Sequence, residues 1–496
     1  MREISSEQRR MRMRAENPWW EGGDIRADYR GLNPRAYFER FARLVEETGV
    51  HRAVVLMGPR RVGKTVLLHH VIDRLLAGGK YGRRDVGYIS LDHPLHTRLS
   101  IEDAADEIRH ASRSPDGPRV LILDEIQYLA DWERHLKAFV DSHPGVKCVV
   151  SGSAAAALRL KSMESGAGRF TDFLLPPLTF HEYLDLRGAG DLVERCPGHD
   201  EPSSPEFRGY RTDDIEGLNR HFVDYLNFGG YPEAVSSPAI RSDPARYIGA
   251  DIVDKVLLRD LPSLYGIQDV QELNALFMTL AYNTAGEVSL DALSQQSGVS
   301  KPTIRRYLEY LEAAFLIKVV HRVDQNARRF KRASRFKVYV TTPALRCALF
   351  GPVSEDSAEM GQLAETAVFA QWFHTDDIRR LHYARWKEGE VDIVYLDPAF
   401  RQEPIWCVEV KWSDRPPSHL EDLSGVFTLA NRYPTISASV TTRTIEAQSD
   451  SWPGVNSLTF TPTSLYCYTV GRNLTSSLSW DGLRPIESGS NIASVN

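Results

Sequence analysis

The stretch that decides the fold is "RAVVLMGPRRVGKTVLLHH", residues 52–70. Its middle fits the pattern G-x-x-x-x-G-K-[ST], follows an apolar run typical of a buried strand and precedes a helical pattern. Backbone N–H groups of such a loop surround phosphates, the lysine reaches the β- and γ-phosphates, and the threonine ligates Mg²⁺. The sequence therefore predicts a site for ATP and Mg²⁺, made by Gly58, Pro59, Arg60, Arg61, Val62, Gly63, Lys64 and Thr65.

A second motif, "LILDE" at residues 121–125, places two carboxylates at the end of an apolar run. Asp124 is predicted to hold Mg²⁺, and Glu125 to orient and polarise the attacking water. The next apolar run ends near Ser153, which is predicted to sense the γ-phosphate. Arg169 is predicted to stabilise charge, either in its own chain or across to a neighbouring copy; an ordinary surface arginine is the alternative.

Composition sets the frame for these motifs. A chain of 496 residues is long enough for several domains, and strand and helix patterns alternate from residue 51 to 186, which predicts a parallel sheet covered by helices. The net charge of -6 means that contact with nucleic acid needs local basic patches. The five cysteines show no metal-binding spacing, and we find neither a signal peptide nor a membrane-spanning run. We therefore expect a cytoplasmic protein with no membrane partner.

The middle of the chain contains a candidate DNA-binding segment. Residues 288–322 show two helical patterns joined by a turn at Ser297-Gly298, then a strand, and residues 326–337 form the densest basic run of the chain. This order is typical of a winged helix, although such folds also serve only as packing modules between domains. The residues predicted to face DNA are Lys301, Thr303, Arg305 and Arg306 on the second helix, and Arg328, Arg329, Arg332 and Arg335 in the basic run, which also includes Lys337.

A further constellation lies in "EGEVDIVYLDPAFRQEPIWCVEVKW", residues 388–412. Asp392 leads into one strand pattern, and the next strand pattern ends in Glu409 and Lys411, which share a face because side chains alternate along a strand. Two carboxylates can hold Mg²⁺ while a lysine positions water and stabilises charge on a phosphodiester. The pattern favours a metal site for cleavage, and a solvated strand face is the alternative.

Taken with "NPWW" at residues 17–20, "FGGYPEAV" at 228–235 and "LAETAVFAQW" at 363–372, these stretches resemble prokaryotic AAA-type ATPases. Members of that group carry a winged-helix segment and a C-terminal PD-(D/E)XK nuclease-like domain. The resemblance implies an α/β multidomain chain: a parallel-sheet P-loop AAA-type ATPase, a helical and winged-helix middle, and an α/β restriction-endonuclease-like C-terminal domain. It also adds Glu365 to the predicted metal site. The implied boundaries are 1–45 (N-terminal segment), 46–186 (ATPase core), 187–265 (insertion and helical region), 266–345 (winged helix), 355–475 (nuclease-like domain) and 476–496 (disordered tail).

The expected function is therefore an ATPase that couples its nucleotide state to DNA binding and to Mg²⁺-dependent DNA cleavage. Genome defence or mobile-element biology fits such an assembly by analogy only. Two alternatives remain open: a non-nucleolytic switch whose C-terminal modules only hold DNA, and a regulatory ATPase whose modules bind protein. A second copy of the chain is a further candidate partner.

Overall fold

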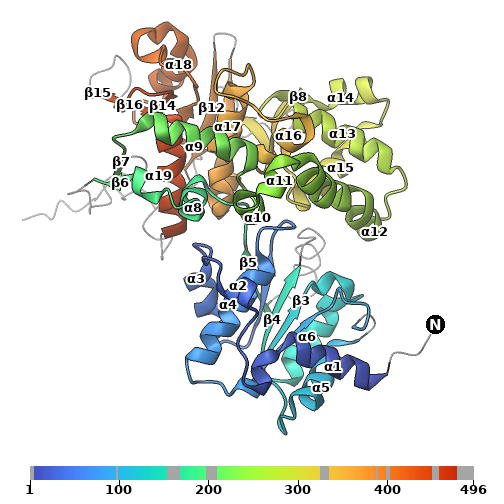
Figure 1. The fold of residues 1–496 in the computed structure, drawn as a ribbon. Helices are drawn as coiled ribbons and strands as arrows, with labels where there is room; N and C mark the ends of the chain where they lie inside the picture. Colours follow the sequence, from blue (N-terminus) through green and yellow to red (C-terminus); the bar gives the residue numbers. More distant parts are fainter. Residues whose placement is uncertain are drawn as a thin grey trace, which may run out of the picture.

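The computed structural model describes residues 5–96, 99–152, 168–196, 209–323, 335–386, 389–397, 403–449 and 457–476. The chain forms two parts, one below the other in Figure 1, with the N-terminal residues up to β5 in the lower part and the later residues in the upper part. Of the predicted functional residues, Ser153, Arg328, Arg329 and Arg332 lie outside the described residues, as does the predicted tail beyond Ser476.

The lower part is built on a sheet whose five described strands are all parallel, in the order β2-β3-β4-β1-β5. Strands β1 to β4 are largely apolar and buried, as expected for a sheet buried on both faces, whereas β5 at one edge carries Thr171 and an exposed Asp172. The predicted parallel α/β fold is therefore confirmed for this part. Its strands are β1 (Ala53–Met57), β2 (Val86–Ser90), β3 (Val120–Asp124), β4 (Lys147–Gly152) and β5 (Phe170–Leu174), and its helices are α2 (Ala27–Arg30), α3 (Phe38–Glu46), α4 (Lys64–Ala77), α5 (Ile101–Ser112) and α6 (Trp132–Ser142).

The N-terminal segment is fixed to the edge of this sheet. After α1 (Ser6–Glu16), the short helix η1 (Pro18–Glu21) carries Trp19 and Trp20, both buried. Their indole N–H groups donate to the carbonyl oxygen of Val86 on β2, at 2.9 and 2.8 Å. The adjacent tryptophans therefore attach the segment to the core by packing and by hydrogen bonds together.

A helical region follows β5 in the chain and belongs to the upper part. It contains two π-helical stretches, η5 (Ala245–Asp254) and η6 (Val256–Asp260). Such helices are rare and are often found at functional sites. The other elements of this region are α8 (Phe180–Leu186), η4 (Gly190–Leu192), β6 (Glu194–Arg195), β7 (Tyr210–Arg211), α9 (Ile215–Phe228), α10 (Pro232–Ser236), α11 (Pro238–Ser242) and α12 (Leu261–Tyr265).

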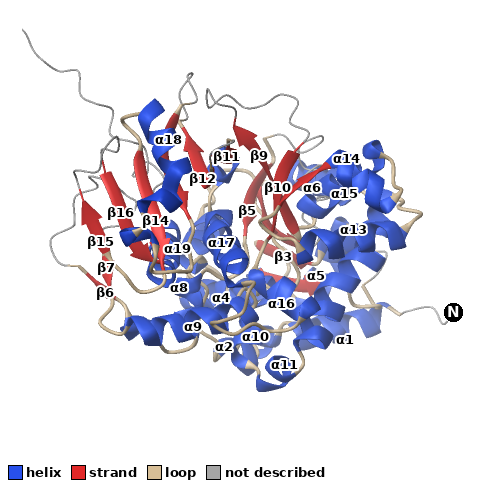
Figure 2. Cartoon of the chain, turned by 90° about the horizontal axis from the view of Figure 1, so that it is seen from above, coloured by secondary structure: helices blue, strands red, loops and turns tan. Residues whose placement is uncertain are grey.

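The upper part is organised by one sheet of nine described strands, in the order β15-β16-β14-β13-β12-β11-β9-β10-β8. Figure 2 shows these strands fanned across the molecule. Strands from residues 266–345 and from 355–475 belong to the same sheet, because β9 pairs with β11 through Arg322 and Tyr383. The strands are β8 (Glu287–Ser289), β9 (Ile317–Val323), β10 (Arg335–Val340), β11 (Leu381–Arg385), β12 (Glu390–Leu396), β13 (Pro404–Glu409), β14 (Ser437–Thr442), β15 (Ala447–Ser449) and β16 (Ser457–Pro462).

The helices of the upper part flank this sheet. None of the helices in the described ranges is long and apolar enough to cross a membrane. The helices are α13 (Val270–Tyr282), α14 (Leu290–Ser297), α15 (Lys301–Ala313), α16 (Pro343–Phe350), α17 (Met360–Ala370), α18 (Ser424–Arg432) and α19 (Thr463–Ser476), with short turns η7 (Gln371–His374), η8 (Asp376–Arg380), η9 (Pro416–Ser418) and η10 (Leu420–Leu423).

Candidate functional site

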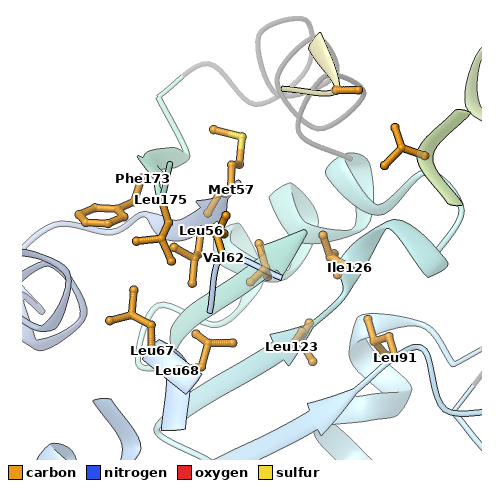
Figure 3. Close-up of a cluster of buried hydrophobic side chains, with 14 of the residues drawn as sticks. Leu56, Met57, Val62, Leu67, Leu68, Leu91, Leu123, Ile126, Phe173 and Leu175 are labelled. Atoms are coloured by element: carbon orange, nitrogen blue, oxygen red, sulfur yellow. The ribbon is translucent and has the colours of Figure 1, made fainter. Parts of the chain in front are cut away.

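The backbone of the loop between β1 and α4 requires glycine at two positions. A Cβ atom on Gly58 would lie 2.2 Å from the carbonyl oxygen of Leu175, and Gly63 has a φ of 94°. Between them, Val62 is fully buried among the apolar side chains at the ends of the strands, as Figure 3 shows. The glycines therefore shape the loop, and Val62 fixes it to the core.

Lys64 lies at the centre of this loop. Its ammonium donates to the carbonyl oxygens of Gly58, at 3.1 Å, and Pro59, at 2.8 Å. Burial lowers the pKa of Lys64, although the carboxylates of Glu125 and Asp124 oppose this effect. The lysine is thus a buried cation held by neutral carbonyls, which leaves its charge available to a phosphate.

Oxygen ligands suited to Mg²⁺ meet beside the lysine. Thr65 Oγ1 donates to Asp124 Oδ2 at 2.7 Å, and the hydroxyl of Tyr88 donates to the same oxygen at 2.9 Å. Ser151, at the end of β4, donates to the other carboxylate oxygen. Hydroxyl and carboxylate oxygens are the donors that Mg²⁺ prefers, so Thr65 and Asp124 fit the predicted metal. Tyr88 and Ser151 position the aspartate.

Glu125 follows directly at the carboxyl end of β3. Its backbone is left-handed, with a φ of 59°, and its N–H donates to Ser151 Oγ at 3.2 Å. The Gln127 side chain donates to its carboxylate. A non-glycine residue in this conformation is uncommon, and here it turns the chain sharply after Asp124. The structure therefore places the predicted base next to the predicted metal ligand.

The upper part brings together the predicted C-terminal residues around a lysine. The ammonium of Lys337, on β10, lies 2.8 Å from Glu365 Oε1, 2.6 Å from Glu390 Oε1 and 2.9 Å from Asp392 Oδ1. The Tyr339 hydroxyl also donates to Glu365, at 2.7 Å. The sequence places Lys337 in the basic run that is a candidate for phosphate contact, but the structure buries this residue, which is 2% exposed. A lysine that alternates with Phe336 and Val338 along a strand has the pattern of an exposed position, so no local pattern indicated its burial.

Glu409 and Lys411 contact each other, as predicted from their shared strand face. Lys411 Nζ lies 2.6 Å from Glu409 Oε1, while Glu409 Oε2 is buried and has no hydrogen-bond partner among the described residues. Burial and the charge of Asp392 raise the pKa of Glu409. Burial would also raise the pKa of Asp392, but the charges of Lys337 and Lys411 hold it below its ordinary value.

These carboxylates are of the kind that binds Mg²⁺, but their arrangement does not fit a metal. The position between Glu365 and Asp392 is taken by the Lys337 ammonium. Within the described ranges, no three His, Cys, Asp or Glu side chains are grouped so that they could hold a metal ion. Glu365 and Asp392 therefore lie together as predicted, but the cation between them is the Lys337 ammonium.

The candidate DNA-facing helix has the predicted amphipathic pattern. On α15, Ile304, Tyr307 and Leu308 are buried, whereas Arg305 and Arg306 are exposed. Gly298 turns the chain with a φ of 72°, and the Ser300 hydroxyl accepts from the backbone N–H of Thr303 at 3.3 Å. Lys301 is exposed but forms an ion pair with Asp291, and Arg335 lies 3.1 Å from Glu287.

Two family models match the chain. Residues 50–184 match a family described as "AAA domain", and residues 219–356 match a "Domain of unknown function (DUF8612)". The first match covers the whole of the nucleotide loop and both acidic residues that follow it. Residues 50–184 are therefore similar to an AAA domain, and they are called the AAA domain below.

The relatives carry no described activity. An uncharacterized protein of Haemophilus influenzae is 23% identical over 64% of this chain and 73% of its own length. An uncharacterized protein of Methanocaldococcus jannaschii is 23% identical over 70% of this chain and 73% of its own length. A solved structure of the replication initiator DnaA bound to AMPPCP and single-stranded DNA is 14% identical and covers 57% of this chain and 93% of that chain, with a TM-score of 0.25. A score this low supports no argument about function.

An arginine that sequence reasoning missed supports the phosphate loop of the AAA domain. Arg35 Nη1 donates to the carbonyl oxygen of Val62 at 2.8 Å, and its Nε and Nη2 lie 2.7 and 2.9 Å from the two oxygens of Glu182 on α8. Burial opposes the ionisation of Glu182, yet Arg35 lowers its pKa to about 2. The two residues are 147 positions apart, and no local pattern links them.

Arg169 is not where the in-chain role requires it. It precedes β5 at the end where Ala53 begins β1, and it forms an ion pair with Asp141 on α6. The phosphate loop follows the opposite end of β1, roughly 16 Å away for a five-residue strand. The prediction that Arg169 stabilises charge within its own chain is therefore wrong. Arg169 lies at the amino ends of the parallel strands, and the phosphate loop lies at their carboxyl ends. A contribution to a neighbouring copy stays a prediction.

Two consecutive arginines of the phosphate loop contact the helical region. Arg60 forms a bidentate ion pair with Asp260 on η6, at 2.7 and 2.9 Å. Arg61 lies 2.6 Å from Asp251 on η5 and also pairs with Glu233 on α10. The nucleotide loop is thus tied by charge to both π-helical stretches.

Proposed function

We propose that this chain is an ATP-binding and ATP-hydrolysing switch that couples its nucleotide state to a DNA-binding upper part. The AAA match supports the nucleotide site, and Lys64, Thr65, Asp124 and Glu125 have the arrangement that phosphate binding and water activation need. Thr65 and Asp124 would hold Mg²⁺, which supplies charge neutralisation at the phosphates when bound.

The observation that carries the coupling is the Arg60–Asp260 pair. Arg60 belongs to the loop that surrounds the phosphates, while Asp260 belongs to the helical region of the upper part. An incoming triphosphate competes with Asp260 for the same guanidinium, because both are anions that arginine binds through two parallel hydrogen bonds. Nucleotide binding would therefore change one of the contacts between the two parts.

The test is Asp260→Asn in the full-length protein, with Asp106→Asn on the exposed surface of α5 as the matched control. ATP hydrolysis should persist in both. DNA affinity, measured by fluorescence anisotropy with and without a non-hydrolysable ATP analogue, should depend on nucleotide in the wild type and the control but not in Asp260→Asn. If the DNA affinity of Asp260→Asn still depends on nucleotide, the proposed coupling through Asp260 is wrong. That result would not contradict the proposal that the protein hydrolyses ATP.

DNA is the proposed partner because exposed arginines on α15, Arg305 and Arg306, lie in the segment that we propose to be a winged helix. Binding of a protein through the same modules is the alternative. DNA binding that weakens with salt separates the two, since phosphate contacts release counterions.

Mg²⁺-dependent DNA cleavage is a second candidate function, because the predicted cleavage residues Glu365, Asp392, Glu409 and Lys411 all lie in the upper part; it requires a rearrangement in which a metal ion replaces the Lys337 ammonium. The assay uses single-stranded, duplex and branched DNA with Mg²⁺ or Mn²⁺, with and without ATP. Cleavage that Asp392→Ala abolishes would establish it. A link to genome defence stays a proposal by analogy.

A further inference from the structure

The Lys337 ammonium is fully coordinated by carboxylates. An ammonium has three N–H donors, and here three separate side chains, Glu365, Glu390 and Asp392, lie within 2.9 Å of it. The lysine side chain is 3% exposed, so water does not compete for these bonds. Asp392 also accepts from the backbone N–H of Val410 at 2.9 Å, which holds the carboxylate in place.

The carboxylates around Lys337 could act as metal ligands, but the Lys337 ammonium already occupies the position of the cation. Glu365 and Asp392 are two of the carboxylates on which the cleavage prediction depends, and both point at the same nitrogen. A divalent ion between them would lie within a few ångströms of that ammonium in a buried site, where like charges repel strongly. The metal and the charged lysine therefore exclude each other.

Lys337 comes from outside the segment that resembles a nuclease. It lies on β10, which pairs with β8 and β9, whereas Asp392 and Glu409 lie on β12 and β13. The side-chain pattern of residues 355–475 alone thus gives an incomplete description of the site.

We propose that Lys337 is the resident cation of this carboxylate cluster and keeps divalent metal out of it. The cleavage candidate then requires Lys337 to leave the cluster, and with Lys337 in place the upper part is a binding module. This inference is independent of ATP binding and hydrolysis by the AAA domain.

The experiment counts Mn²⁺ bound to nucleotide-free, full-length protein from the electron paramagnetic resonance signal of the free ion. Lys337→Met keeps the length of the side chain and removes its charge. At the same Mn²⁺ concentration, this variant should bind one more Mn²⁺ per chain than the wild type. Adding Asp392→Asn to Lys337→Met should abolish the gain. Lys411→Met is the matched control: it removes the neighbouring ammonium, leaves Lys337 in place and should gain no site. The AAA domain contributes equally to every sample.

Two results would overturn the proposal. One is a folded Lys337→Met protein, verified by circular dichroism, that binds no more Mn²⁺ than the wild type. The other is a wild-type protein that already binds Mn²⁺ in a way that Asp392→Asn abolishes. The second result needs only the wild type and Asp392→Asn, so the proposal stays testable if Lys337→Met fails to fold.

Discussion

Replacing Glu182 with glutamine should destabilise the protein through a single buried charge. Glutamine keeps the shape of the side chain but leaves the Arg35 guanidinium, whose side chain is 7% exposed, without a counterion. Breaking one partner of a buried pair costs about 3–5 kcal/mol. The fall in the pKa of Glu182 from 4.5 to about 2 gives a similar magnitude, roughly 3.4 kcal/mol at 1.36 kcal/mol per pKa unit.

The dependence on pH has a definite sign. The folded-state pKa of Glu182 lies below its unfolded value, so the stabilisation is complete above pH 4.5 and is lost as pH falls towards 2. The difference between wild type and Glu182→Gln should therefore shrink from roughly 3.4 kcal/mol at pH 7 to about 1.4 kcal/mol at pH 3.

The assay is urea unfolding followed by tryptophan fluorescence at both pH values, together with binding of a fluorescent ATP analogue. Nucleotide affinity should also fall, because Arg35 holds the Val62 carbonyl of the phosphate loop. Asp28→Asn is the control: its pair with Arg26 is as short, at 2.6 Å, but water solvates both ions and the unfolding midpoint should not move. A loss below about 1 kcal/mol at pH 7, or an equal loss at both pH values, would refute this account of the pair.

Four other variants test the remaining assignments. Lys64→Ala should abolish ATP binding by equilibrium dialysis, whereas Glu125→Gln should bind ATP and hydrolyse it slowly; a wild-type rate for Glu125→Gln would disprove the assigned base. Gly58→Ala should also lose ATP binding, because its Cβ would meet the Leu175 carbonyl oxygen at 2.2 Å, and retained affinity would show that the loop can shift. Neutralising Arg328, Arg329, Arg332 and Arg335 together should weaken binding to every DNA sequence and reduce the slope of log K against log[salt] by about 0.9 per lost contact; an unchanged slope would place DNA elsewhere.

The nucleotide site was predictable because its determinants are local or follow from strand order. The loop motif names Lys64 and Thr65 directly, and the carboxyl ends of parallel strands meet at one edge of a sheet, which brings Asp124 to Thr65. The same reasoning, applied with attention to strand direction, excludes Arg169 from that edge. Arg35 could not be found this way, because its partner Glu182 becomes adjacent only when two distant segments pack.

The strand pattern predicted Asp392 and Glu409 of the C-terminal site and the resemblance added Glu365, but neither predicted Glu390 or the cation, Lys337. Strand alternation correctly pairs Glu409 with Lys411, since both belong to one segment. Lys337 is the last residue of the basic run, and composition alone favours solvent exposure for such a residue. Its true position depends on β9 joining β11, a pairing between segments that the sequence treats as separate domains.

That shared sheet constrains how nucleotide could act on the upper part. Lys337 on β10 and Asp392 on β12 are connected through β9 and β11 by continuous strand pairing, so their backbone positions are fixed relative to each other. The contacts between the phosphate loop and η5 and η6, by contrast, are side-chain ion pairs at the surface between the two parts. A triphosphate that displaces Asp260 from Arg60 therefore acts on the weaker set of contacts. It follows that ATP should shift the upper part as one body and leave Lys337 among its carboxylates. The arrangement therefore supports nucleotide control of DNA binding better than nucleotide control of DNA cleavage.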